Sequence, residues 1–105
     1  MGVLLDTLPD TQAAICVSDL SAFDALTECQ RRGVTVPGQI AISGFGAYEI
    51  AGVSHPTITT IDPHPRLIGT EVANLILSLR SRANGSAPAP TTIKIGWNLR
   101  AAQST

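Results

Sequence analysis

The sequence contains few charged residues, and its positive and negative charges nearly cancel. Seven Lys and Arg residues stand against eight Asp and Glu residues in a chain of 105, which gives a formal net charge of −1 and a pI near 6.0. No basic stripe with interleaved aromatics runs along it, and aromatic residues make up only 4%. Proteins that bind a phosphate backbone carry such a basic footprint. We therefore do not expect this chain to bind nucleic acid directly.

Long hydrophobic runs are also absent. No apolar stretch reaches membrane-spanning length, although 44% of the residues are hydrophobic. The first five residues run into Asp6 without the basic region or the cleavage site of a signal peptide. These absences predict no membrane contact and a cytoplasmic location.

Cysteine is scarce, and no spacing of residues suits a metal ion. Cys16 lies in an apolar run and Cys29 on the apolar side of a predicted helix. We interpret both as small buried hydrophobic residues and not as a disulfide or a redox pair. The sequence predicts no metal site and no cofactor.

The motifs of common enzyme classes are missing as well. Ser18-Asp19 lacks the glycines of a nucleophile elbow, and Gly44-Phe45-Gly46 lacks the third glycine and the helix of a dinucleotide fingerprint. Asp19 and Asp62 alone do not supply the clustered carboxylates of a phosphate-accepting domain. We predict no catalytic residue.

What is present is a strand, helix and strand pattern over residues 13–46. The apolar run 13–17 predicts a strand covered on both faces. The helix that follows ends at Gly33, and residues 40–45 predict a second strand. The helix carries apolar residues at three-residue steps, namely Leu20, Phe23, Leu26 and Cys29. The length of this unit fits a right-handed crossover between parallel strands.

The middle of the chain predicts one more strand and a strongly amphipathic helix. Residues 47–54 suggest an irregular turn or a short edge segment, and the β-branched run 57–61 predicts a third strand. Two prolines make the connector 62–65 stiff. The helix predicted over residues 66–82 has an apolar stripe of Ile68, Val72, Leu75, Ile76 and Leu79.

The two ends of the chain are predicted to be irregular. Residues 83–90 have the composition of a surface loop, with Asn84 or Gly85 at the helix end. Alternation over residues 93–100 predicts a fourth strand with one covered face, and residues 101–105 predict a frayed tail. Residues 3–5 resemble the last turn of a helix that begins upstream, which suggests a truncated chain; a frayed natural terminus is the alternative.

Four candidate ligand-binding residues follow the predicted strands. Ser18 and Asp19 follow the first strand, Gly46 follows the second, and His64 follows the third. A parallel sheet binds ligands at the carboxyl ends of its strands, where a hydroxyl, a carboxylate, free N–H groups and an imidazole suit a small polar ligand. Structural roles are the alternatives: a helix cap for the first two, a turn for Gly46, and an exposed connector for His64.

Four segments together resemble the C-terminal part of lactose/galactose-repressor-type transcription regulators. Their order and spacing fit that family: residues 14–20, 32–37, 40–45 and 59–61, with Gly69 eight residues beyond the last. Residues 28–31, and Gly44-Phe45 with Glu49-Ile50, look most like its gluconate-operon repressor branch. The resemblance covers nearly the whole chain.

The resemblance implies an α/β fold, namely a parallel-sheet lobe of a periplasmic-binding-protein-like (type I) effector domain. Residues 1–62 and 91–105 would form the C-terminal lobe, and residues 63–90 the crossing and a helix of the other lobe. The implied function is effector sensing and dimerisation: a homodimer binds a small sugar or sugar acid between its lobes. A helix-turn-helix domain absent from this chain would read the DNA.

Two positions depart from the sugar-binding members of that family. Ser18 stands where many carry asparagine, and Gly46 stands where they carry aspartate. Because a carboxylate repels the carboxylate of an acid, its loss at Gly46 favours an anionic effector such as gluconate.

The family's dimer contacts carry over to the helix after Asp19 and to residues 47–54. Without the other lobe, the helix at 66–82 would lose its cover and favour self-association. Two other classes remain open: a fragment of a periplasmic sugar-binding protein of a transport system, which export would identify, and a small α/β enzyme, which turnover would identify.

Overall fold

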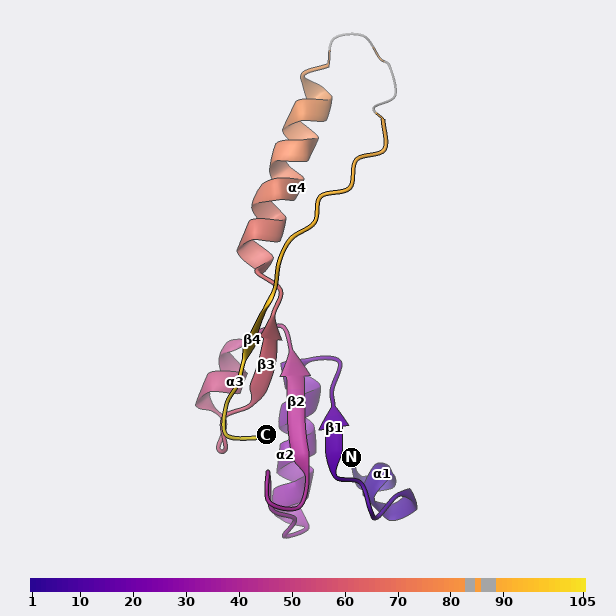
Figure 1. The fold of residues 1–105 in the computed structure, drawn as a ribbon, viewed down its shortest axis with the longest axis vertical. Helices are drawn as coiled ribbons and strands as arrows, with labels where there is room; N and C mark the ends of the chain where they lie inside the picture. Colours follow the sequence, from indigo (N-terminus) through magenta and orange to yellow (C-terminus); the bar gives the residue numbers. More distant parts are fainter. Residues whose placement is uncertain (83–84, 86–88) are drawn as a thin grey trace.

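The computed structural model describes residues 1–82, 85 and 89–105 and shows a mixed α/β chain built on one four-stranded sheet (Figure 1). The strands lie in the order β1-β2-β3-β4; the first three are parallel, and β4 is antiparallel to β3. The elements are α1 (Gly2–Thr7), β1 (Ala13–Ile15), α2 (Asp19–Arg31), β2 (Ala41–Phe45), α3 (Glu49–Val53), β3 (Thr59–Asp62), α4 (Pro65–Arg80) and β4 (Asn98–Arg100). The predicted parallel crossover is confirmed.

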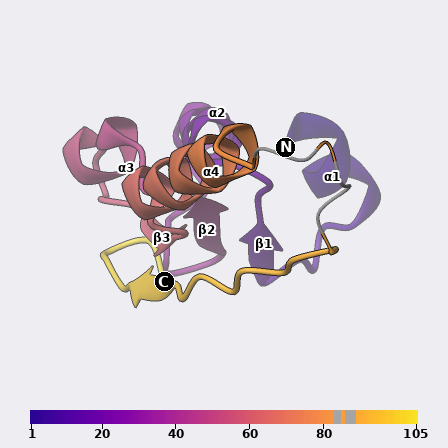
Figure 2. The ribbon, with the colours of Figure 1, turned by 90° about the horizontal axis from the view of Figure 1, so that it is seen from above.

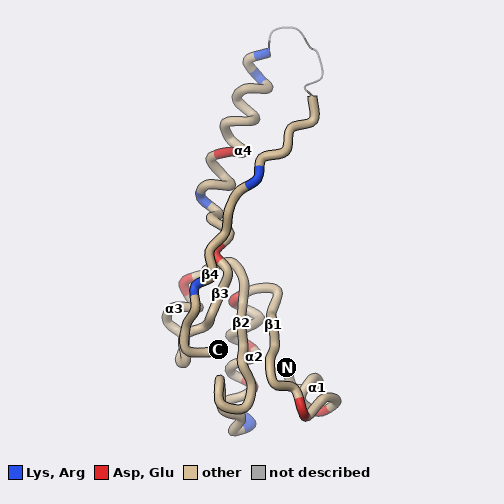
Figure 3. The backbone as a smooth tube through the Cα atoms, in the orientation of Figure 1, with Lys and Arg blue, Asp and Glu red and all other residues tan. Residues whose placement is uncertain are grey.

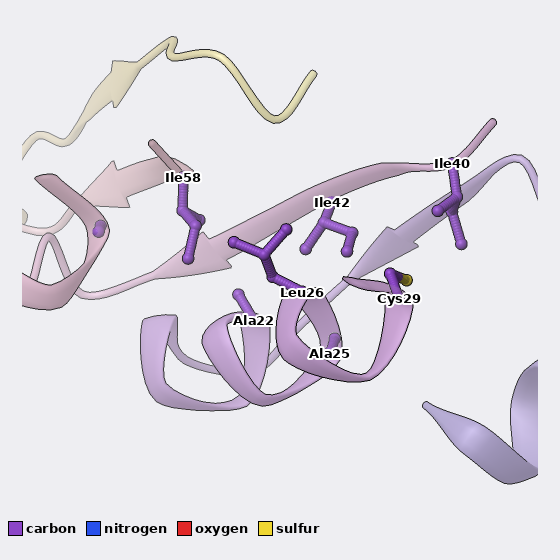
Figure 4. Close-up of a cluster of buried hydrophobic side chains, with 8 residues drawn as sticks. Ala22, Ala25, Leu26, Cys29, Ile40, Ile42 and Ile58 are labelled. Atoms are coloured by element: carbon purple, nitrogen blue, oxygen red, sulfur yellow. The ribbon is translucent and has the colours of Figure 1, made fainter. Parts of the chain in front are cut away.

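The core lies between the sheet and one face of α2. Ser18 is the N-cap of α2, and the helix ends before Gly33, whose φ of +71° suits glycine. The buried side chains are Ala22, Ala25, Leu26 and Cys29 from α2, Ile40 and Ile42 at β2, Ala51 from α3, and Ile58 (Figure 4). The prediction that both cysteines are buried is confirmed for Cys29, whereas Cys16 is only half-buried; both thiols are free.

The opposite face of the sheet is open at β1. Figure 2 shows α2 and α3 on the same side of the strands. Ala14 and Cys16 pack against the core on that side, whereas Ile15 and Val17 are 88% and 87% exposed. The prediction of a strand covered on both faces is therefore wrong for β1. It is an edge strand, and alternate residues point to a face that nothing in the described chain covers.

α1 is joined to α2 by a network of charged side chains. The Arg32 guanidinium donates to Asp6 and to Glu28, each at 2.6 Å, and Arg31 donates to Glu28 at 2.7 Å. The guanidinium of Arg31, and next that of Arg32, lowers the pKa of Glu28 to about 2. The helical turn predicted near the start of the chain is confirmed as α1, and Leu5 adds an apolar contact with the core.

α4 extends away from the sheet. The molecule measures 63 × 27 × 17 Å, and Figure 1 shows α4 and the returning chain projecting from one end of the sheet. No residue of α4 is buried, and Val72 in the predicted stripe is 50% exposed. The helix predicted over residues 66–82 is confirmed with slightly different bounds, and the described residues leave much of its apolar stripe exposed, with Ile76 at 52% and Leu79 at 38%.

β4 is shorter than the predicted fourth strand. The alternation over residues 93–100 predicts a strand, but only residues 98–100 pair with β3, and all three are exposed. Residues 91–97 have no strand beside them in the described part of the chain. An alternating sequence needs a neighbouring strand to complete its hydrogen bonds, which explains the shorter element.

The end of the chain differs most from the prediction. Residues 101–105 do not form a frayed tail, because Ser104 is fully buried. Its backbone N–H donates to Thr57 O at 3.0 Å, and its carbonyl accepts from Ile42 N at 2.8 Å. Its hydroxyl donates to Ile42 O at 2.6 Å and accepts from Thr59 N at 2.9 Å. Ser104 therefore joins β2 to the start of β3.

The segment 47–54 contains the five-residue helix α3 in place of an irregular turn. The loop predicted over residues 83–90 falls mostly outside the described residues, and α4 ends earlier than predicted, with Ser81 as its C-cap. None of the helices described here is both long and apolar enough to cross a membrane.

We expect Ser104→Ala to destabilise the fold by about 1–3 kcal/mol, because the buried Thr59 N–H and Ile42 carbonyl each lose a partner. Urea unfolding followed by circular dichroism measures this change. Ser78→Ala is the matched control, since its exposed hydroxyl bonds only within α4. Equal midpoints for the two variants would contradict the assigned role of Ser104.

Candidate functional site

The sequence places the candidate residues at the edge of the sheet where the parallel strands end. β1, β2 and β3 run in the same direction, so their carboxyl ends share one edge. Ser18 follows β1 and caps α2, where its hydroxyl accepts a hydrogen bond from Ser21 N at 3.2 Å. The structure thus gives the capping role, predicted for Ser18 and Asp19 together, to Ser18.

Asp19 ties the start of α2 to the loop after β2. Its side chain is fully buried, and Oδ2 accepts from the backbone N–H of Tyr48 at 2.7 Å. Oδ1 has no hydrogen-bond partner among the described residues and lies against Gly44. A methyl group at Gly44 would overlap Oδ1 and lie 3.0 Å from the Asp19 Cα. Only glycine therefore allows this approach of α2 to β2.

The loop after β2 uses its own N–H groups internally. Gly46 N donates to Ile61 O at 2.9 Å, and Ala47 N donates to Thr60 Oγ1 at 3.2 Å. With Tyr48 N bonded to Asp19, no N–H of residues 46–48 is left for a ligand. The prediction of free N–H groups at Gly46 is therefore wrong. Gly46 and Ala47 have positive φ angles, +118° and +52°. The N–H groups of this loop accordingly point to β3 and to Asp19 of α2.

A cavity of about 450 Å³ opens beside this loop, between the ends of β2 and β3 and the first turn of α4. Its lining consists of Gly46, Ala47, Asp62, His64, Pro65, Arg66, Leu67 and Arg100. Two of the predicted site residues, Gly46 and His64, are brought together here. Ser18 and Asp19 are not part of this lining; Asp19 supports the loop from behind.

Asp62 is the most heavily used polar group of the cavity. It is 7% exposed, and Oδ1 accepts from His64 N at 2.9 Å while Oδ2 accepts from Arg100 Nη2. The backbone N–H of His64, and next the Arg100 guanidinium, lowers the pKa of Asp62. His64 adopts a left-handed φ of +55°, which turns its N–H back onto Asp62. Asp62 is therefore a charged, fully engaged carboxylate.

The cavity carries an excess of positive charge. Its lining contains two guanidinium groups, Arg66 and Arg100, and one carboxylate, Asp62, which already pairs with Arg100. The first turn of α4 adds the partial positive charge of a helix N-terminus, because His64 provides no side-chain cap. Figure 3 shows that elsewhere acidic and basic residues are scattered along the chain. The site suits a small polar ligand with a negative group.

Sequence reasoning missed Arg66 and Arg100 as site residues. It placed Arg66 in a helix and Arg100 at the end of an alternating run, without a reason to bring them together. The signal lay in the topology: once β4 pairs with β3, Arg100 stands opposite Thr60 and reaches Asp62. Single-sequence periodicity contains no information on that pairing.

We expect Gly44→Ala to destabilise the protein by about 1–3 kcal/mol, because the added methyl overlaps the buried Asp19 carboxylate. Gly52→Ala in α3 is the matched control, since nothing lies within 4 Å of a methyl there and alanine favours a helix by about 0.5–1 kcal/mol. Thermal unfolding compares the two. A Gly44→Ala variant as stable as Gly52→Ala would contradict the close packing.

Comparison with known proteins shows similarity along the whole chain. The periplasmic binding protein-like domain family matches residues 3–105. The regulator CelR of Thermobifida fusca is 29% identical over 104 residues, which is 99% of this chain and 30% of that protein. The regulator GntR of Escherichia coli K12 is 32% identical over 94 residues, 87% of this chain and 27% of that protein. The chain thus spans about three tenths of these relatives.

A solved structure described as a CelR–cellobiose complex has the same fold. It superposes with a TM-score of 0.87 at 28% identity, over 97% of this chain and 30% of that one. The relatives are transcription regulators, and the arrangement of strands agrees with the parallel sheet described above.

Proposed function

This chain belongs to the periplasmic-binding-protein-like domain family of LacI-type transcription regulators, and we propose that it serves as the effector-sensing and dimerisation part of a cytoplasmic, non-catalytic DNA-binding regulator. DNA contact would come only from an N-terminal domain outside these residues. The observation that carries the proposal is the cavity at the carboxyl edge of the parallel sheet.

The effector we propose is a small sugar or sugar acid, gluconate being the acid we test. The cavity volume of about 450 Å³ is ample for a hexose-sized molecule, and its polar lining can hydrogen-bond hydroxyl groups. The positive excess from Arg66 and Arg100 favours the acid, as does the absence of a carboxylate at Gly46. Among the predicted contacts, Gly46 and His64 lie in this cavity, whereas Ser18 and Asp19 would act from its margin.

The division into lobes follows the path of the chain. Residues 1–62 and 91–105 would form one lobe, and residues 63–90 would cross to the other. Two observations support this: the chain leaves the sheet at Asp62 and returns at Asn98, and α4 buries no residue against the sheet. The cavity then lies at the crossing, where a ligand can contact both lobes and favour one arrangement of them.

We expect the full-length gene product to bind gluconate at least about tenfold more tightly than glucose, because a charge-assisted hydrogen bond contributes roughly 1.5–3 kcal/mol. Isothermal titration calorimetry with both compounds measures the difference. Binding of glucose alone would refute the sugar-acid effector while leaving a sugar-sensing role intact.

The proposed dimer surface lies on α2 and α3. Leu20, Tyr48 and Val53 are 58%, 51% and 69% exposed, although each is large and apolar. α2 and α3 lie side by side, so these residues can form one patch. Exposed apolar patches mark association surfaces, and a symmetric dimer would bury the same patch on both subunits.

Equilibrium sedimentation tests this surface. We expect the full-length gene product to be a dimer and Val53→Glu to shift it toward monomer, because the added charges would be buried against each other. Val3→Glu on α1 is the matched control, at 78% exposure. A wild-type protein that stays monomeric at high concentration would contradict the dimer.

The 105-residue chain on its own is expected to self-associate through the exposed stripe of α4. Val72→Glu should weaken this association, since Val72 lies in that stripe.

A further inference from the structure

Arg100 lines the cavity and pairs with Asp62, the only carboxylate among the described residues of its lining, and no prediction from the sequence assigned it a role. We propose that Arg100 binds the carboxylate of an acidic ligand in this cavity, together with Arg66. The inference rests on the proposed function and names the group that would select an acid over a neutral sugar.

The contact with Asp62 fixes where the Arg100 guanidinium lies. Asp62 is held in turn by His64 N at 2.9 Å and is almost completely buried, so its position is set by the backbone. A guanidinium has five N–H donors in a rigid plane, and one nitrogen of Arg100 is directed to Asp62. The group is thereby oriented before any ligand arrives, which reduces the cost of ordering it on binding.

Most of the Arg100 side chain remains available. It is 61% exposed although it pairs with Asp62, and it lines the cavity. A carboxylate accepts two parallel N–H bonds from one guanidinium, and such paired bonds are stronger than neutral ones. Arg66 approaches the same cavity from α4 and makes no ion pair among the described residues. Two cations from different elements thus converge on one small volume.

The backbone offers no competing anion site beside them in the loop after β2. The N–H groups of Gly46, Ala47 and Tyr48 are all bonded within the protein. Asp62 presents no uncompensated charge, since both of its oxygens are engaged. The cationic side chains left for a ligand carboxylate are therefore Arg66 and Arg100, beside the uncapped N-terminus of α4, and Arg100 is the one already held in place.

The test is titration calorimetry of the full-length gene product with gluconate and glucose. We expect Arg100→Gln to weaken gluconate binding roughly ten- to a hundredfold, the effect of losing a charged hydrogen bond, and to weaken glucose binding less, so that the ratio of gluconate affinity to glucose affinity falls. Lys94→Gln is the matched control, because it removes the same charge from an exposed residue that does not line the cavity. It should leave both affinities unchanged.

Arg100→Lys guards against a variant that fails to fold. It keeps the charge and can still pair with Asp62, but it lacks the planar fork, so we expect a loss of gluconate affinity between those of wild type and Arg100→Gln. Equal gluconate affinity in wild type and both variants would overturn the role of Arg100 and leave effector sensing standing. A wild-type protein that binds neither gluconate nor glucose would overturn the proposed sugar effector as well.

Discussion

The ion pair between Asp62 and Arg100 joins the point where the chain leaves the sheet to the point where it returns. Asp62 ends β3 and Arg100 ends β4, and about forty residues of chain, including α4, lie between them. No residue of α4 is buried, so this ion pair and the short β3–β4 ladder are the specific hydrogen-bonded contacts that join the outgoing segment to the returning one in the described chain. The geometry of the cavity therefore depends on a contact between residues far apart in sequence.

The four-stranded sheet is stabilised on one side only. Its apolar core lies under α2, and the last residues of the chain supply the hydrogen bonds that a further strand would make between β2 and β3. Ser104 does this with both its backbone and its hydroxyl, in a fully buried position. The exposed Ile15 and Val17 mark the face that this packing leaves uncovered.

Local sequence patterns predicted the elements whose stabilising contacts are local. The helical periodicity of α2 and α4, the caps at Ser18 and Gly33, and the strand-helix-strand spacing all appear in the structure. The patterns failed where distant segments decide the outcome: the buried end at Ser104, the short β4, and the N–H groups at Gly46. Arg100 was missed as a site residue for the same reason, since it reaches Asp62 only through strand pairing.

The same contacts suggest how ligand binding would reach the proposed dimer surface. Ala47 lines the cavity, and its neighbour Tyr48 is the N-cap of α3 and is bonded to the buried Asp19 of α2. A ligand held between Arg100 and this loop therefore acts on a segment that is continuous with α3 and fixed to α2. Under the proposed function, a ligand that binds one lobe arrangement more tightly shifts the population toward it. Asp19 is the group through which that preference would be shared by the two helices that carry Leu20 and Val53.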